Sequence, residues 1–102
     1  MTNDEHMIRV LIEYIEDIGE PNSNWPIHDF EKVSYSRWAA EQILAMILAH
    51  PEWTPMRSVE EFKNLVGKFA SKPTHKTDAT FIFRTAYDVA TDVSDIFYAM
   101  TP

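Results

Sequence analysis

The last quarter of the chain places apolar residues at alternating steps of four and three positions, the spacing of one face of a helix. These residues are Ile82, Ala86, Val89, Val93, Ile96 and Met100, flanked by Phe83, Ala90 and Phe97. The seam runs for nearly three heptads, so it predicts a long helix over about 78–100. A helix with such a wide apolar face must bury it against other helices, which the rest of the chain has to supply.

Residues 4–18 form a second segment with a helical pattern. Its stripe consists of Ile8, Leu11, Ile12, Ile15 and Ile18. Thr2 or Asn3 can cap the start of the helix. Gly19 can adopt the left-handed conformation that ends a helix, and Pro21 closes the exit.

Two more helices are predicted between these segments. Residues 35–49 are apolar on nearly all sides, which indicates a central helix, with Ser34 or Ser36 as its cap. Residues 58–71 are amphipathic and begin with Ser58 and Glu61 at the spacing of a capping box. The resulting expectation is an all-α, compact four-helix bundle-like domain that spans residues 1–102 as a single unit.

The two longer connections, 20–33 and 50–57, carry Trp25 and Trp53. Leaving a tryptophan in water is costly, so these aromatic-bearing loops are expected to fold back onto the bundle. We therefore interpret Trp25, Trp38 and Trp53 as core residues, with a ligand pocket lined by them as the open alternative.

The net charge of −7 is concentrated at the start of the chain. Residues 1–31 hold eight acids and one base, whereas residues 32–102 hold eight of each. Glu13, Glu16, Asp17 and Glu20 are spaced to share one helical face. Their mutual repulsion and the negative end of the helix dipole both disfavour this arrangement. The pattern suggests a recognition surface for a basic partner, and the alternative is a solvated face that keeps the protein soluble.

A second acidic face is predicted on the last helix. Asp88, Asp92 and Asp95 follow one another at four and three positions, and Phe81 falls on the same polar side. An exposed phenylalanine beside charges can act as a binding anchor. The alternative is that the Trp25 or Trp53 loop covers Phe81.

Several classes of function are disfavoured by residue types and spacing. The chain has no cysteine, only two glycines, and no two histidines three or four positions apart, so neither a catalytic residue, a metal site nor a cofactor is expected. Lys63, Lys68, Lys72 and Lys76 form a basic group at the end of the third predicted helix. Lys68 and Lys72 suit the negative C-terminal end of that helix, and the net charge opposes direct binding to duplex DNA. The longest apolar stretch, residues 43–49, is too short to span a membrane, and the acidic start is unlike a secretory signal; a cytoplasmic location is expected.

These observations favour a non-enzymatic protein-binding module that docks on a basic protein surface, such as that of a nucleic-acid-binding protein. Carboxylates along a helix can stand in for phosphates, so a small phage or mobile-element inhibitor of the anti-CRISPR type is one concrete version. The first alternative is a structural or self-associating helical protein, for which a homodimer is conceivable. The second is a small-ligand binder or enzyme that uses the Trp and His groups.

Overall fold

Four α-helices make up the bundle in the computed structural model of this chain, which describes residues 2–70 and 77–101, without the side chains of 70 and 77–80. The helices are α1 (Asn3–Ile18), α2 (Ile27–Ala49), α3 (Pro55–Ala70) and α4 (Thr77–Met100). The described residues contain no strand. This confirms the all-α four-helix architecture expected from the hydrophobic spacing.

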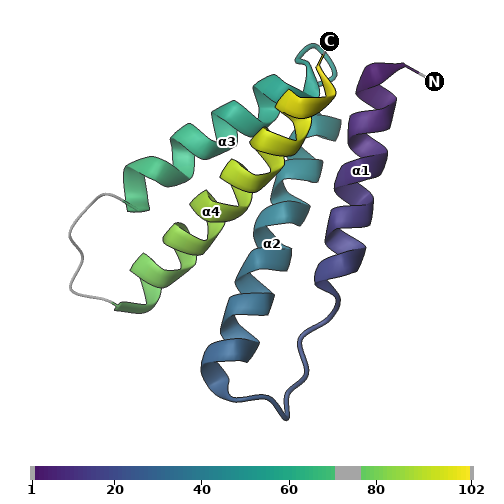
Figure 1. Cartoon of the computed structure of the whole chain (residues 1–102). Coiled ribbons are helices and arrows are strands. Elements are labelled where there is room, and N and C mark those ends of the chain that lie inside the picture. The colour runs from purple at the N-terminus through teal and green to yellow at the C-terminus, as the bar shows by residue number, and fades with distance from the viewer. Residues whose placement is uncertain (1, 71–76, 102) are drawn as a thin grey trace.

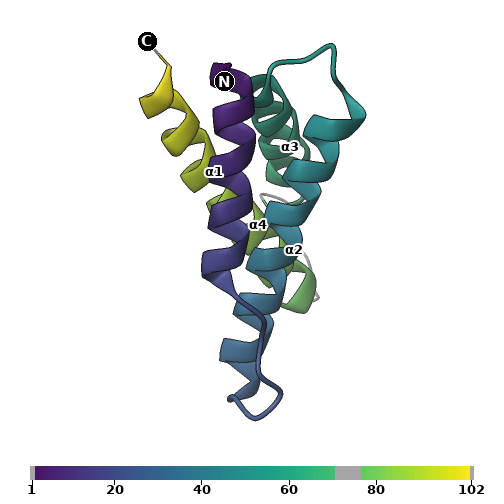
Figure 2. The same ribbon diagram turned by 90° about the vertical axis from the view of Figure 1, so that its right-hand side faces the viewer.

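The helices pack unequally around a shared core (Figure 1). α4 packs most extensively against α3 and next against α2, whereas α1 packs mainly against α2. Figure 2 shows α1 nearest to the viewer and α3 on the far side of the bundle. The outward faces of α1 and α3 therefore lie on opposite sides of the molecule.

The core draws apolar side chains from all four helices. The fully or almost fully buried ones include Leu11 of α1, Ile43 of α2, Val59 of α3, and Val93 and Phe97 of α4. Side chains of this size each contribute a few kcal/mol by leaving water. The seam of α4 is thus confirmed as a core face, although Phe97, expected beside the seam, lies at its centre.

α1 begins and ends as its sequence predicts. The Thr2 hydroxyl accepts a hydrogen bond from the Glu5 N–H at 3.1 Å, which caps the helix. Gly19 has a φ of 73° and donates its N–H to the Ile15 carbonyl at the end of the helix. The buried face is rotated slightly from the predicted stripe, because Met7 is buried while Ile12 is 41% exposed.

α2 begins at Ile27, eight residues before its predicted start. An Asx turn at Asn22 brings the chain into Pro26, whose carbonyl accepts the Phe30 N–H and so starts the helix. Ser34 is inside the helix, and its hydroxyl donates to the Phe30 carbonyl four residues back. The expected cap at Ser34 or Ser36 was therefore wrong.

α3 also begins earlier than predicted, at Pro55 in place of Ser58. The cap is Thr54, whose hydroxyl accepts the Arg57 N–H at 3.2 Å. Proline suits the first position of a helix because its ring sets a helical φ and its missing N–H would have no partner there. Ser58 is fully buried inside the helix, so the predicted capping box at Ser58 does not form.

The connections on either side of α2 are shorter than predicted, and their tryptophans do not cover the core. Trp25 is 40% exposed, and neither Trp25 nor Trp53 is among the residues packed against the buried cluster. Trp38 lies on the outside of α2 and is 42% exposed. The assignment of these three tryptophans to the core was wrong, because α1–α4 fill the core with smaller aliphatic residues and phenylalanine.

Candidate functional site

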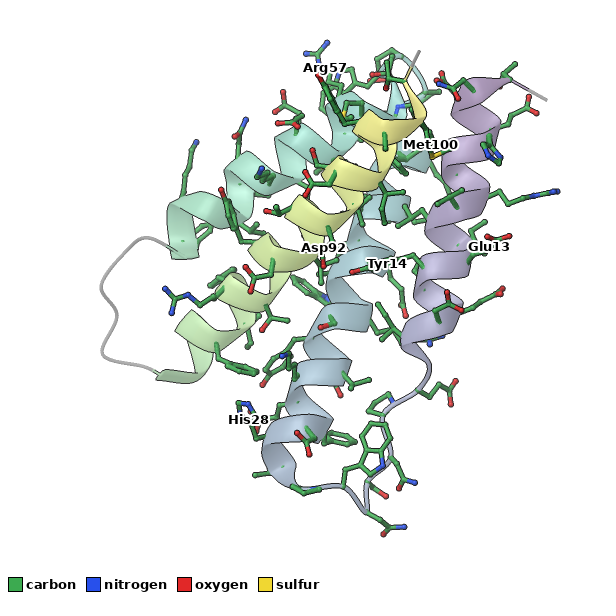
Figure 3. The ribbon with its side chains drawn as sticks, in the orientation of Figure 1. Glu13, Tyr14, His28, Arg57, Asp92 and Met100 are labelled. Carbon is green, nitrogen blue, oxygen red and sulfur yellow. The ribbon has the colours of Figure 1, made fainter. Side chains whose placement is uncertain are left out.

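The acidic face of α1, defined as Glu13, Glu16, Asp17 and Glu20, is exposed in all four positions. Only the first three residues lie on the helix, because α1 ends at Ile18 and Gly19 turns the chain with a φ of 73°; the expectation that Glu20 shares the helical face was wrong. None of the ion pairs among residues 2–70 and 77–101 involves these four carboxylates. In Figure 3, Glu13 points away from the rest of the bundle, while its neighbour Tyr14 lies on the side that faces α4. The face is therefore open to contact by another molecule.

The C-terminal end of α1 receives its positive charge from another helix. Nη1 of Arg37, on α2, donates to the Gly19 carbonyl at 2.8 Å and lies 3.5 Å from the Ile15 carbonyl. The same guanidinium forms a 2.9 Å ion pair with Glu41. Arg37 thus offsets the negative end of the α1 dipole, which weakens the sequence argument that the acids at this helix end are costly to the fold.

The acidic residues of α4 lie on its exposed side between α3 and α1. Asp88, Asp92 and Asp95 are all exposed. Asp88 lines a hollow beside α3, whereas the carboxylate of Asp92 accepts a long, 3.5 Å hydrogen bond from the Tyr14 hydroxyl of α1. Burial, followed by the charge and hydrogen bond of Asp92, raises the pKa of Tyr14. Asp92 therefore contributes to the contact between α1 and α4 through Tyr14.

Phe81 is a packing residue and does not form an exposed anchor. Its ring lies 5.1 Å from that of His28 and 5.6 Å from that of Tyr35, both on the N-terminal half of α2. Edge-on and tilted contacts at such distances are favourable for aromatic rings. Phe81 is thus half-buried against α2, part of which lies in the eight residues by which α2 exceeds its predicted length, and its role as a partner-binding residue stays a prediction.

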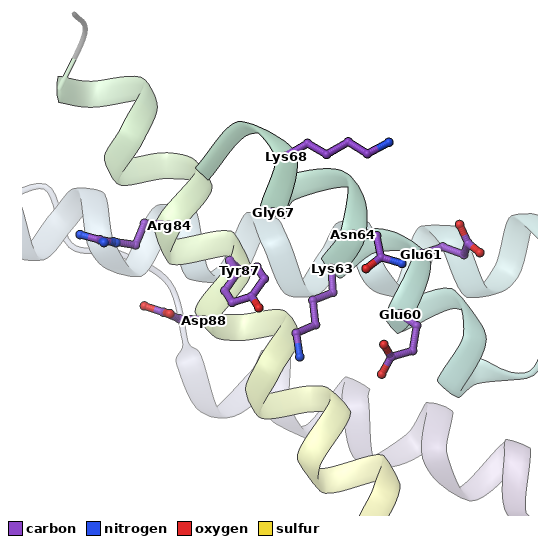
Figure 4. Close-up of a pocket in the computed structure, with 9 residues that line it drawn as sticks. All are labelled: Glu60, Glu61, Lys63, Asn64, Gly67, Lys68, Arg84, Tyr87 and Asp88. Carbon is purple, nitrogen blue, oxygen red and sulfur yellow. The ribbon is translucent and has the colours of Figure 1, made fainter. Parts of the chain in front are cut away.

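A polar hollow of about 1150 Å³ lies between α3 and α4 (Figure 4). Its lining contains three acids and three bases, which are Glu60, Glu61, Asp88, Lys63, Lys68 and Arg84. The Lys63 ammonium lies 5.5 Å from the centre of the Tyr87 ring, a cation–π contact that helps to hold the two helices. Because the charges balance, the hollow has no clear preference for anions or cations. Lys72 and Lys76, which the sequence groups with Lys63 and Lys68, lie outside the described residues.

The turn between α2 and α3 stacks three side chains. The rings of His50 and Trp53 are nearly parallel at 3.9 Å, and the Arg57 guanidinium lies 4.9 Å from the Trp53 ring. A hydrogen bond with His50 lowers the pKa of Glu52. Trp25 and Trp53 line neither the polar hollow nor the apolar hollow between α2 and α3, whereas Trp38 and His50 both line the apolar one. The described residues hold no cluster of three potential metal ligands.

A second hollow, of about 440 Å³, lies between α2 and α3 and was missed by sequence reasoning. We call it the α2/α3 groove and define it by Trp38, Ala45, Met46, Leu65, Phe69 and Phe83. The apolar character of α2 on all sides was visible in the sequence and was taken as a sign of complete burial. Only the packing shows which side stays open.

The fold and these surfaces define a class: a small helical bundle with charged and apolar surfaces available for contact. The chain matches no family model, no curated protein and no solved structure. No helix among the described residues is both long enough and apolar enough to cross a membrane. Because a helical bundle is compatible with many functions, the function has to be argued from the surfaces themselves.

Proposed function

We propose that this chain is a non-enzymatic protein-binding module that docks on a basic protein surface through the acidic face of α1. The observation that carries the proposal is that Glu13, Glu16 and Asp17 on α1, and Glu20 two residues beyond its end, are all exposed and make no ion pair within the described residues. A cation from another molecule can therefore approach each carboxylate without displacing an existing partner.

The electrostatics of α1 favour such a contact. Carboxylates three and four positions apart repel one another by a few tenths of a kcal/mol per pair, and lysines or arginines of a partner would relieve that repulsion. Charge complementarity of this kind mainly raises the association rate and the selectivity for basic partners. It also makes the interaction weaken as salt concentration rises.

The α4 carboxylates are a second, weaker element of the proposal. Asp88 and Asp95 are exposed, but Asp92 already contacts Tyr14. Glu13 points away from α4, so one flat partner surface would not meet both acidic sets equally. We therefore assign the main contact to α1 and a peripheral role to α4.

The partner class that fits this chemistry is a nucleic-acid-binding protein, because such proteins present rows of lysine and arginine. Carboxylates spaced along α1 could occupy part of that surface and exclude nucleic acid. A small phage or mobile-element inhibitor acting in the cytoplasm is one version of this proposal. The net charge of −7 opposes direct binding of the chain to duplex DNA.

The test compares two variants with the same net charge. The first carries Glu13→Lys, Glu16→Lys and Asp17→Lys; the control carries Glu5→Lys, Asp29→Lys and Glu52→Lys, three exposed acids elsewhere. Each variant and the wild type are immobilised and exposed to host lysate at low and high salt, after circular dichroism has shown equal helicity. We expect proteins that bind the wild type and the control at low salt, are released by high salt, and do not bind the α1 variant.

Two results would contradict the proposal. The first is capture of the same proteins by the α1 variant and the wild type. The second is binding that does not weaken between low and high salt. For a captured nucleic-acid-binding protein, displacement of a labelled duplex by the wild type, followed by fluorescence anisotropy, then tests the mimicry version directly.

A further inference from the structure

The α2/α3 groove is an apolar surface that the described parts of the four helices leave uncovered. Phe69 of α3 stacks on Phe83 of α4 at 4.9 Å between ring centres, which forms part of the wall of the groove. The lining side chains are apolar apart from Gln42 and His50. The groove therefore offers a partner contacts with hydrocarbon and aromatic carbon, and almost no charge.

Large apolar side chains on both edges of the groove are exposed to solvent. Trp38 is 42% exposed on the α2 rim, and Leu65 is 49% exposed on the α3 rim. Leu48 of α2, which does not line the groove, is 65% exposed. An exposed apolar surface of this kind is a common mark of a protein–protein contact.

The two sides of α2 differ in burial. Its inward side is buried through Ala39, Ala40, Ile43 and Ile47, while Trp38 and Leu48 are 42% and 65% exposed on its outward side. A helix that is apolar on all sides is normally surrounded by other helices. α1, α3 and α4 surround α2 only in part, so the remaining side needs a further element to be buried.

We infer that this element is a second copy of the same chain, and that the α2/α3 groove is the interface of a symmetric homodimer. An apolar surface with a hollow between two rims can complement itself, because a two-fold axis places Trp38 of each copy against the groove of the other. In such an isologous contact each surface serves both roles.

The distribution of charge favours a second copy at this surface. The excess negative charge belongs to residues 1–31, and the acidic face of α1 lies on the side of the bundle opposite α3. Residues 32–102, which include α3 and most of α2, carry no net charge. Two copies can therefore meet through the α2/α3 groove with their acidic faces directed away from each other, which approach through α1 would not allow.

The oligomeric state in solution tests the inference directly. Sedimentation equilibrium over a concentration series should show a reversible monomer–dimer transition for the wild type. Leu65→Glu places a charge in the interface and should raise the dimer dissociation constant by about thirtyfold or more. The matched control Ile27→Glu, at a 70% exposed aliphatic residue outside the groove, should leave the dissociation constant unchanged.

Site-specific crosslinking identifies the interface independently of stability. Because the chain has no cysteine, Ala45→Cys introduces a single thiol in the groove, and Tyr98→Cys introduces one at a 76% exposed position of α4. A short bis-maleimide should link two copies of the Ala45→Cys variant and not two copies of the Tyr98→Cys variant. A strict monomer at millimolar concentration would overturn the inference. So would a dimer that survives Leu65→Glu, or one that crosslinks through position 98.

Salt separates this inference from the proposed function. Dimerisation through an apolar surface between two chains of charge −7 should strengthen as salt screens their repulsion. Binding of a basic partner by the acidic face of α1 should weaken under the same change. The two can therefore fail independently, and the Glu13, Glu16 and Asp17 reversal should not abolish the dimer.

Discussion

The guanidinium of Arg37 donates a 2.8 Å hydrogen bond to the carbonyl of Gly19, the residue that ends α1. The two residues are eighteen positions apart, and the contact fixes the end of α1 against the middle of α2. It supplies the positive charge that α1 lacks in its own last turn, where the sequence has no basic residue. This one contact links the fold to the acidic face, because it lets Glu16, Asp17 and Glu20 sit beside a helix end that is already compensated.

Arg37→Ala should therefore destabilise the bundle. Loss of charged hydrogen bonds to backbone carbonyls that are partly buried is expected to lower the free energy of unfolding by about 1–3 kcal/mol. Arg37→Lys should recover only part of this, because an ammonium group cannot reproduce the fork of a guanidinium. The control Arg57→Ala removes an exposed arginine with a 4.0 Å ion pair and an exposed cation–π contact with Trp53, and should cost about 1 kcal/mol or less. Urea denaturation measures all three, and equal losses for Arg37→Ala and Arg57→Ala would refute the role given to Arg37.

Removing the hydroxyl of Thr54 and removing that of Ser58 should have different effects on the free energy of unfolding. Thr54→Ala removes the hydroxyl that accepts the Arg57 N–H and should cost about 1 kcal/mol. Ser58→Ala removes a buried hydroxyl that has no hydrogen-bond partner among the described residues, so it should be neutral or slightly stabilising. Thermal denaturation ranks the two variants. A larger loss of stability for Ser58→Ala than for Thr54→Ala would restore the capping box expected from the sequence.

Phe81→Ala should loosen the first two turns of α2. The Phe81 ring contacts His28 and Tyr35, so its removal should lower the free energy of unfolding by about 1–3 kcal/mol, less than for a fully buried phenylalanine. Amide hydrogen exchange should accelerate mainly in residues 27–35. Tyr98→Ala, at a 76% exposed aromatic on the same helix, is the matched control and should change neither quantity. Unchanged exchange in Phe81→Ala would mean that the contact does not hold this part of α2.

Tyr14 should make the protein less stable at high pH. Burial, reinforced by the charge of Asp92, raises the pKa of Tyr14 above its usual value of 10.0. The folded state therefore holds the Tyr14 proton more tightly than the unfolded state, so this contribution to stability is complete below pH 10 and is lost as the pH rises through the folded-state pKa. Tyr14→Phe should remove that part of the pH dependence, as measured by urea denaturation between pH 8 and pH 11.

Ultraviolet titration gives an independent check on Tyr14. The difference between the titration curves of wild type and Tyr14→Phe isolates the ionisation of this one phenol. Asp92→Asn should lower the pKa of Tyr14 but leave it raised, because burial is the larger cause. A pKa that is unchanged in Asp92→Asn would show that the 3.5 Å contact does not persist in solution.

The sequence was sufficient where a structural signal is local. The seam of α4 and the stop at Gly19 are both confirmed, because apolar spacing and a positive φ are properties of a few neighbouring residues. The starts of α2 and α3 were misplaced for the same reason. Serine is a common helix cap, so the predicted starts were placed at Ser34 and Ser58. Both serines lie inside their helices: α2 is capped by Pro26 and α3 by Thr54.

Some features of the candidate sites follow from the sequence, and others depend on the packing of the helices. Exposure of Glu13, Glu16 and Asp17 follows from their spacing opposite the apolar stripe of α1, so the sequence by itself determined this part of the acidic face; Glu20 lies beyond the helix end. Tertiary structure alone decided that Arg37 reaches Gly19, that α2 covers Phe81, and that the outward side of α2 stays open beside Leu65. Periodicity determines which face of a helix seeks burial, because it depends on one helix at a time. Which neighbour covers that face, and where cover is lacking, depends on how all four helices pack together.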